Sequence, residues 1–424
     1  MNGLTNISGY QTNEMKEGDK TKNVPKSFAT VWSRRLLIKM LSRLEFGKLV
    51  LTEGDKQWSF GEGGEPCARV NILDSTAYHK ILFGGSVGGG EAYVDGLWDV
   101  DNLTALIQIM VLNMSLLDRM EKGFAWLLRP LDLARHIFNS NNKRGSKRNI
   151  LAHYDLGNEM YETFLDPTMM YSSAIYPEPE STLDEAQLYK LEEICRKLDL
   201  QTTDSVIEIG TGWGGFAIHA AGKYGCHVTT TTISEAQYAE AKRRVEAAGL
   251  NDKITLLQRD YRDLSGQYDK LVSIEMIEAV GHKFLPGFFQ KCGELLTPDG
   301  KMLLQAITIA DQKYEQYVRT VDFIQRFIFP GGCLPSNNRM VQLIANKTDM
   351  VVRQIDDFGF DYARTIDDWR RRFHMANASL QKQGYDERFR RLWEYYLCYC
   401  QGGFLERSIS VVHVVATRPG NRRQ

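Results

Sequence analysis

Short apolar runs alternate with longer stretches of mixed polarity along the second half of the chain. The runs have the length of buried strands, which we expect at 206–209, 227–232, 254–258, 270–274 and 301–307. The intervening stretches are long enough for helices, which we expect at 182–198, 216–221, 234–248 and 284–296. Repeated alternation of strand and helix predicts an α/β fold with a doubly wound, mostly parallel sheet. Ligands of such sheets bind at the carboxyl ends of the strands.

The rest of the chain predicts a smaller unit before this sheet and further elements after it. Before it, we expect an α+β domain with a helix at 32–44, strands at 48–53, 58–61 and 68–72, and an apolar helix at 103–117. This domain shows no constellation of acids and bases, so we expect it to handle lipid or to form the contact of a homodimer. After the sheet, we expect aromatic-rich helical segments at 314–329 and 365–399 and a last strand at 409–417.

These elements divide the chain of 424 residues into four parts. Residues 1–27 are polar and predict a disordered lead-in. Residues 28–130 form the smaller N-terminal domain, 131–150 form a basic linker, and 151–424 form the larger α/β domain. Two folded domains agree with the length, because a single domain more often has roughly 100–200 residues.

A glycine-rich turn joins the first predicted strand of the larger domain to its helix. Gly210, Gly212, Gly214 and Gly215 follow the strand, and Glu208 stands two residues before the first glycine. Glycines let the backbone approach a ligand closely, and a helix N-terminus offers unpaired N–H groups to a carboxylate or phosphate. The spacing differs from the Gly-x-Gly-x-x-Gly of dinucleotide sites, which favours S-adenosylmethionine over NAD. A role of these glycines in packing alone stays an open alternative.

Composition and charge narrow the classes of partner. The net charge of −1 gives no overall attraction to nucleic acid, so we expect none as a partner. Seven cysteines are scattered without a Cys-x-x-Cys pair, which argues against disulfides and a metal site and favours the cytoplasm. The N-terminus has no secretory signal pattern. The apolar stretch 103–117 contains polar residues and is shorter than the ~20 residues that cross a bilayer, so we expect no membrane span.

A basic segment lies between the two predicted domains. Residues 135–148 contain five Lys and Arg side chains and no acidic one, and the apolar stretch 124–128 precedes them. Basic and apolar groups together suit an anionic lipid surface, where each basic residue contributes about 1 kcal/mol. The segment therefore predicts peripheral contact with the inner face of a membrane, with a solvated linker as the alternative.

Several separate motifs of the larger domain match those of one enzyme family. From Ala152 onward, the chain resembles the cyclopropane-fatty-acyl-phospholipid synthases, a group that includes the mycolic acid cyclopropane synthases. These are class I S-adenosylmethionine-dependent methyltransferases with a Rossmann-like fold. Ser86 to Gly96 also resembles the N-terminal domain of the longer members. The matching motifs are His153-Tyr-Asp-Leu-Gly-Asn, Asp166-Pro-Thr-Met-Met-Tyr-Ser, Glu208-Ile-Gly-Thr-Gly-Trp-Gly-Gly, Thr232-Ile-Ser-Glu-Ala-Gln, Asp260-Tyr-Arg-Asp-Leu, Phe329-Pro-Gly-Gly-Cys-Leu-Pro and Phe358-Gly-Phe-Asp-Tyr.

The resemblance implies a demanding reaction on membrane lipid. It predicts transfer of a methylene group from S-adenosylmethionine to the cis double bond of unsaturated acyl chains in phospholipids, which forms cyclopropane fatty acids. A carbocation arises on the way, and a base removes a proton from the new methyl group. Aromatic side chains of the C-terminal helices would keep water from this cation, or serve as ordinary core. Two alternatives stay open: C-methylation of the acyl group that gives a methyl or methylene branch, and a lipid-binding protein without turnover.

The resemblance also implies which residues contact the cofactor. Thr232 and Gln237 hold the ribose by neutral hydrogen bonds, although a threonine run also has good β-propensity. Tyr171 and Ser172 approach from the N-terminal side. Tyr261 and Arg262 flank the adenine. The full set of expected cofactor-binding residues is Tyr171, Ser172, Glu208, Gly210, Gly212, Gly214, Thr232, Gln237, Asp260, Tyr261 and Arg262.

Glu278, just after the fourth predicted strand, is the expected catalytic carboxylate, with a solvated acid at a helix start as the alternative. By resemblance, Glu278, Ser173, Gln305, Ile307 and Tyr362 form the cradle of a bicarbonate ion that acts as the base, and we expect catalytic roles for all five. The better-studied members have Cys in place of Ser173 and His in place of Gln305. Gln cannot become cationic or carry a proton. The use of bicarbonate is therefore in doubt.

Overall fold

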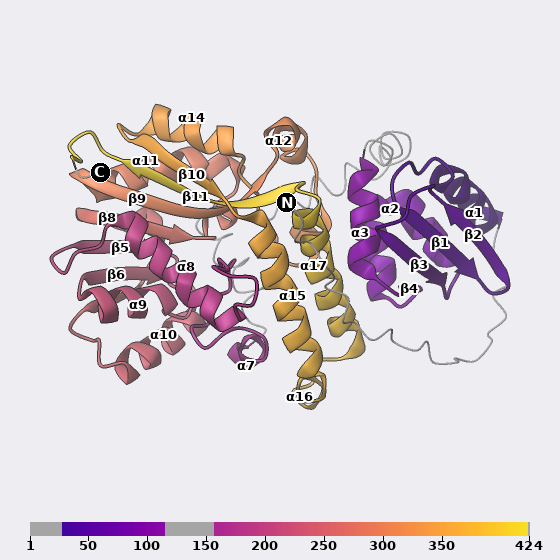
Figure 1. Ribbon diagram of the computed structural model, residues 1–424, viewed down its shortest axis with the longest axis horizontal. Helices are drawn as coiled ribbons and strands as arrows, with labels where there is room; N and C mark the ends of the chain where they lie inside the picture. The colour runs from indigo at the N-terminus through magenta and orange to yellow at the C-terminus, as the bar shows by residue number, and fades with distance from the viewer. Residues whose placement is uncertain (1–27, 115–156, 423–424) are drawn as a thin grey trace. The chain divides into compact units, whose positions relative to one another are not determined.

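The computed structural model of the chain describes residues 28–114 and 157–422 (Figure 1). Two compact units, Met1–Trp126 and Leu127–Gln424, each have their own sheet. The predicted lead-in 1–27, the basic segment 135–148 and the first part of the His153 motif lie outside the described residues. All seven cysteines lie within them and are free thiols. Within the two described ranges, no helix is both long and apolar enough to cross a membrane.

The described part of the N-terminal unit has a four-stranded sheet of order β2-β1-β3-β4. Strands β1 and β3 are parallel, and the other neighbours are antiparallel. The predicted helix at 103–117 is interrupted, because α3 ends at Leu112 and the Asn113 side chain bonds the backbone of Glu45 and Phe46; residues 115–117 lie outside the described residues. The elements are α1 (Phe28–Leu41), β1 (Lys48–Glu53), β2 (Lys56–Phe60), β3 (Cys67–Ile72), α2 (Thr76–Val94), β4 (Trp98–Val100) and α3 (Leu103–Leu112).

Helix α2 contains a glycine-rich run that did not predict a helix. Glycine in a helix interior costs about 1 kcal/mol relative to alanine. Gly85 has a φ of 55° and interrupts α2 with a kink. A Cβ at Gly88 would lie 2.2 Å from the carbonyl oxygen of Lys80. Close backbone packing across the kink therefore explains the glycine at position 88.

The C-terminal unit is built on a seven-stranded sheet of order β10-β11-β9-β8-β5-β6-β7. Strands β5 to β9 are parallel, and β11 is antiparallel to both β9 and β10. The predicted doubly wound, mostly parallel sheet is confirmed. The strands are β5 (Ser205–Ile209), β6 (His227–Thr232), β7 (Ile254–Gln258), β8 (Tyr268–Ile274), β9 (Leu296–Ile309), β10 (Val351–Asp357) and β11 (Ile409–Thr417).

Helices cover both faces of this sheet (Figure 1). Along β9, Met302 and Leu304 pack into the core with α11 and α14, whereas Leu303 packs into the opposite core with α8 and α9. This alternation follows from the two-residue repeat of a strand. The helices are α7 (Asn158–Glu162), α8 (Leu183–Leu198), α9 (Gly215–Tyr224), α10 (Glu235–Ala247), α11 (Leu285–Leu295), α12 (Asp311–Tyr317), α13 (Phe323–Phe327), α14 (Asn337–Lys347), α15 (Gly359–Met375), α16 (Asn377–Lys382) and α17 (Glu387–Leu405).

The region after β9 differs from the prediction in two places. The helix expected at 314–329 is two short helices, because Asp322 and Gln325 form a capping box that starts α13. Helix α14 and strand β10 were not predicted. Helices α15 and α17 lie side by side and account for most of the helical segment expected at 365–399 (Figure 1).

Candidate active site

The glycine turn joins β5 to α9 at the carboxyl edge of the sheet. Gly210, Gly212 and Gly214 have φ values of 104°, 54° and 88°, which L side chains rarely adopt. A Cβ at Gly210 would lie 3.1 Å from the side chain of Met276, whereas a Cβ at Gly212 would meet nothing within 4 Å. Gly214 is the N-cap of α9, and no side chain caps this helix N-terminus. The turn therefore leaves an open space at Gly212 beside a helix N-terminus that suits an anionic group.

The residues expected at the ribose and the adenine follow β6, which pairs with β5, and β7, which pairs with β6. Thr232 Oγ1 donates a hydrogen bond to Gln237 Oε1 at 2.9 Å, so the structure brings these two together. Both oxygens of Asp260 accept hydrogen bonds of 2.8 Å from the Arg262 guanidinium. This guanidinium lies 5.4 Å from the ring centre of Tyr261. The neutral Thr232–Gln237 pair therefore lies after β6, and the charged Asp260–Arg262 pair lies after the neighbouring strand β7.

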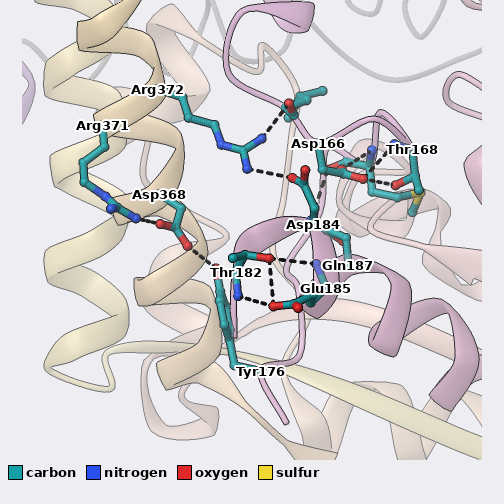
Figure 2. Close-up of polar contacts among 12 residues, drawn as sticks. Asp166, Thr168, Tyr176, Thr182, Asp184, Glu185, Gln187, Asp368, Arg371 and Arg372 are labelled. Carbon is teal, nitrogen blue, oxygen red and sulfur yellow. Dashed lines mark hydrogen bonds and ion pairs between the residues drawn. The ribbon is translucent and has the colours of Figure 1, made fainter. Parts of the chain in front are cut away.

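The segment 165–182, which carries the residues expected on the N-terminal side of the cofactor, is anchored to two helices (Figure 2). Arg372 of α15 donates to the carboxylate of Asp184 of α8 at 2.6 Å and to a backbone carbonyl at the start of the segment at 3.1 Å. Further along, Tyr176 donates to Asp368 of α15 at 2.7 Å. Helices α8 and α15 therefore fix this segment.

Ser172, in this segment, belongs to a buried polar group with Lys190 and Glu208. Lys190 Nζ donates to Ser172 Oγ at 2.8 Å, and burial lowers the pKa of Lys190 to about 8. Glu208 accepts a hydrogen bond of 2.5 Å from Thr230 Oγ1, and burial raises its pKa to about 8. Glu208 thus interacts with Lys190 electrostatically and with β6 through a hydrogen bond.

Glu278 lies in the 3-10 helix η3 (Ile277–Ala279), which follows β8. Its Oε1 accepts a hydrogen bond of 2.6 Å from the N–H of Ile307, while its Oε2 is buried without a hydrogen-bond partner. Burial and, secondarily, the charge of Glu275 raise the pKa of Glu278 to about 8. The alternative of a solvated acid at a helix start is therefore wrong, and Glu278 carries a proton over part of the neutral pH range.

A second carboxyl group, Glu275, stands at the carboxyl end of β8 and was not predicted. Its Oε1 accepts hydrogen bonds from the Ser173 N–H at 2.9 Å and from Gln305 Nε2 at 2.8 Å. Its Oε2 accepts a hydrogen bond of 2.6 Å from the Tyr362 hydroxyl. Burial raises the pKa of Glu275, whereas these three hydrogen bonds and the charge of Lys190 act against the rise. Three of the expected catalytic residues therefore surround a carboxyl group that was not expected.

The sequence carried one signal for Glu275. It directly follows the apolar run of β8 and stands three residues before Glu278, so two carboxyl groups follow one strand. Lys190 and His413 gave no such signal. Lys190 lies in an amphipathic helix, where a lysine is usually exposed. His413 is brought beside Gln305 only by the pairing of β11 with β9.

Aromatic rings extend from Tyr362 along helices α15 and α17. The Tyr362 ring stacks on Phe404 with centroids 4.5 Å apart, and the centroid of Trp369 lies 6.0 Å from that of Tyr362. Trp369 lies 5.3 Å from Tyr171, whose hydroxyl oxygen lies 2.8 Å from that of Tyr396. Four other aromatic residues of the C-terminal helices pack on one another as ordinary core: Phe323, Phe327, Tyr395 and Tyr399.

These residues fit S-adenosylmethionine and do not fit bicarbonate. The open space at Gly212 and the uncapped N-terminus of α9 suit the amino acid end of the cofactor, and the buried carboxyl groups after β8 complement a sulfonium charge. Three of the donors that the resemblance assigns to bicarbonate, on Ser173, Gln305 and Tyr362, instead contact Glu275, and the N–H of Ile307 contacts Glu278.

The raised pKa of Glu278 has a consequence for stability. Folded Glu278 keeps its proton up to its pKa of about 8, whereas the unfolded residue loses it near the ordinary pKa of 4.5. Between these values the folded state binds more protons, so the free energy of unfolding falls as pH rises, by up to about 1.4 kcal/mol per pH unit for this one group. Glu278→Gln cannot titrate, and denaturant unfolding from pH 5 to 8 should show the variant gaining stability relative to the parent as pH rises. Parallel curves for parent and variant would contradict this pKa.

Comparisons with known proteins agree with this geometry. A family model described as mycolic acid cyclopropane synthetase matches residues 141–414. The chain is 36% identical to the cyclopropane-fatty-acyl-phospholipid synthase of Escherichia coli, over 84% of this chain and 89% of that protein. It is 35% identical to the tuberculostearic acid methyltransferase UfaA1 of Mycobacterium tuberculosis, over 92% of this chain and 91% of that protein.

Solved structures resemble a large part of the chain. The cyclopropane synthase MmaA2 of Mycobacterium tuberculosis superposes with a TM-score of 0.60 and 28% identity, over 64% of this chain and 98% of that chain. The mycolic acid cyclopropane synthase CmaA1, in a structure complexed with SAH and CTAB, superposes with a TM-score of 0.58 and 29% identity. The protein is a methyltransferase that uses S-adenosylmethionine. With the family match covering more than half of its length, the chain belongs to the mycolic acid cyclopropane synthetase family.

Proposed function

We propose that this enzyme transfers a methylene group from S-adenosylmethionine to cis double bonds in the acyl chains of membrane phospholipids and forms cyclopropane rings. The observation that carries the proposal is the pair of buried carboxyl groups, Glu275 and Glu278, beside the cofactor turn and next to an aromatic wall. A methyltransferase whose acceptor is already nucleophilic needs no base next to the methyl group, whereas ring closure requires removal of a proton. The name of the Escherichia coli relative supports the phospholipid substrate.

The residues of the site have separable tasks in this reaction. Bound S-adenosylmethionine supplies a methyl group that its sulfonium charge makes electrophilic. The glycine turn and α9 hold the amino acid end, and the Thr232–Gln237 pair meets the ribose. The rings of Tyr362 and Trp369 exclude water and present their π faces to a developing carbocation.

The proposal is tested by incubating the purified protein with S-adenosylmethionine and vesicles whose phospholipids carry one cis double bond in each acyl chain. Mass spectrometry should find acyl chains that have gained one CH2 and no longer react with ozone. Acyl chains that gain one CH2 but keep a double bond would show that the product is a branched chain and not a cyclopropane ring. Unchanged acyl chains, in a protein shown to bind the cofactor, would contradict the proposed function.

We further propose that the enzyme works in the cytoplasm at the inner face of the membrane, and that residues 135–148 bind anionic headgroups there. Charge reversal of four basic residues should reduce binding to anionic vesicles by at least about tenfold, because each contributes about 1 kcal/mol and tenfold corresponds to 1.4 kcal/mol. The reversed residues are Lys143, Arg144, Lys147 and Arg148.

Co-sedimentation at increasing salt measures this binding, which screening should weaken. A control variant reverses four exposed basic residues elsewhere and should bind like the parent: Lys242, Arg243, Lys347 and Lys382. Equal loss of binding in both variants would assign the effect to net charge and not to residues 135–148. A homodimeric assembly stays a prediction.

A further inference from the structure

We propose that Glu275 is the general base of this enzyme, and that its carboxylate takes the place that the resemblance assigns to a bicarbonate ion. The inference rests on the proposed function and deepens it. In this proposal, a side chain of the enzyme is the base whose proton removal allows the ring to close.

Three donors surround the carboxylate of Glu275. Its carboxylate accepts three hydrogen bonds, from the Ser173 N–H at 2.9 Å, Gln305 Nε2 at 2.8 Å and the Tyr362 hydroxyl at 2.6 Å. A carboxylate has the same planar O–C–O group as bicarbonate and accepts the same donors. With all three donors engaged, a separate anion would lack its hydrogen bonds and would lie against the charge of Glu275.

The side chain of Gln305 is held in one orientation by His413. Its Oε1 lies 3.0 Å from His413 Nε2, and His413 Nδ1 lies 3.0 Å from Lys197 Nζ. The pKa of His413 is lowered well below its usual value, first by burial, so this ring is neutral. A lysine must donate to Nδ1, which leaves the proton of the ring on Nε2, where it donates to Gln305 Oε1. The amide NH2 of Gln305 is therefore held toward Glu275 as a permanent neutral donor.

The backbone of Glu275 has an unusual conformation. Its φ is 47°, in the left-handed region that non-glycine residues rarely adopt. Such strain destabilises the folded chain and concentrates at functional sites. A glycine would adopt this conformation freely, so the Glu side chain is kept at position 275 at the expense of stability.

The charges of the neighbours favour Glu275 over Glu278 as the ionised member of the pair. Glu275 accepts three hydrogen bonds, and the positive charge of Lys190 stabilises its anion. Glu278 accepts a bond from one backbone N–H, and its other oxygen has no partner. Two adjacent buried carboxyl groups cannot both ionise readily. Glu278 therefore keeps the proton while Glu275 carries the negative charge.

The reaction then balances with groups that the enzyme and its substrates supply. The π electrons of the acyl double bond form a new bond to the sulfonium methyl carbon, and the C–S bond breaks with its electron pair going to sulfur. S-adenosylhomocysteine and a carbocation on the acyl chain result. Glu275 takes a proton from the new methyl group, and the released C–H electron pair closes the ring onto the cationic carbon. Glu275 returns the proton to solvent before the next turnover.

Two variants test this role. Glu275→Gly removes the carboxylate, suits the backbone and leaves an empty cradle, whereas Glu275→Gln fills the cradle with a group that cannot take a proton. Both should lose about 10²–10⁴-fold in turnover, the usual contribution of a general base. Added bicarbonate should restore much of the turnover of Glu275→Gly and none of that of Glu275→Gln. The parent should turn over equally in bicarbonate-free and bicarbonate-containing buffer.

Asp199→Gly, which relieves similar strain at a φ of 54°, is the control and should keep full activity.

Bicarbonate binding gives a readout that does not depend on product. Carbon-13 NMR with labelled bicarbonate should show line broadening with Glu275→Gly and none with the parent or Glu275→Gln. Bicarbonate binding by the parent, loss of parental turnover without bicarbonate, or near-full activity of Glu275→Gln would each overturn the inference. A parent that makes no product from any unsaturated lipid would refute the proposed function, and the NMR result would still decide whether Glu275 fills the cradle.

Discussion

Gly212→Val should weaken binding of S-adenosylmethionine by up to about 100-fold while the protein stays folded. A side chain at Gly212 meets no protein atom within 4 Å, so its bulk would enter the space that we assign to the cofactor. Forcing extra atoms into a filled site costs typically 1–3 kcal/mol, and a cost of about 3 kcal/mol corresponds to two factors of ten in Kd. Isothermal titration calorimetry with S-adenosylhomocysteine measures the effect.

Gly249→Val is the matched control for this experiment. Gly249 lies in the same unit, has a φ of 67° and also has no neighbour within 4 Å of a built Cβ. The backbone strain of the two substitutions is therefore similar, and only Gly212→Val should lose binding. Equal affinities for the two variants would place the cofactor elsewhere.

Tyr362→Phe should shift the acidic limb of the pH–rate profile upward by about one to two pH units. The Tyr362 hydroxyl donates to Glu275 at 2.6 Å and holds its pKa down against burial. Loss of a hydrogen bond to a charged group costs about 1.5–3 kcal/mol, which corresponds to about one to two pKa units. Since Glu275 must be deprotonated to act, turnover at lower pH falls, and it recovers at higher pH.

The other groups that face Glu275 keep their places in this variant, namely Lys190, Glu278, Gln305 and the Ser173 N–H. Tyr314→Phe is the control, because it removes a buried tyrosine hydroxyl that bonds His282 and not Glu275. Measurement of kcat from pH 5 to 9 for parent and both variants tests the shift. Superimposed profiles for the parent and Tyr362→Phe would show that this hydrogen bond does not tune the base.

The sequence predicted the parallel sheet well because its strands are distinct apolar runs. Strands β6, β7 and β11 have the predicted bounds, and β11 is buried along most of its length. Strand β10 was missed because it lies at the sheet edge and is polar, with Arg353, Gln354 and two aspartates among its residues. Helix α2 was missed because its run of glycines disfavours a helix, and the backbone packing across the kink that explains Gly88 leaves no mark in the residue pattern.

The site was predictable where motifs carry it and unpredictable where tertiary pairing creates it. Gln305 and Tyr362 were found through resemblance, but their common contact with Glu275 joins β9, α15 and the end of β8. No local pattern indicates that three distant donors meet one carboxylate. The buried Lys190 likewise depends on the packing of α8 against the sheet.

The central claim is that a carboxylate of this enzyme removes a proton from the transferred methyl group. The most direct measurement supplies S-adenosylmethionine with a fully deuterated methyl group, in bicarbonate-free buffer, and determines the deuterium content of the lipid product by mass spectrometry. The account predicts a cyclopropane product that retains two of the three deuterium atoms, formed at the same rate when bicarbonate is added. A product that retains all three, or product formation only after bicarbonate is added, would contradict it.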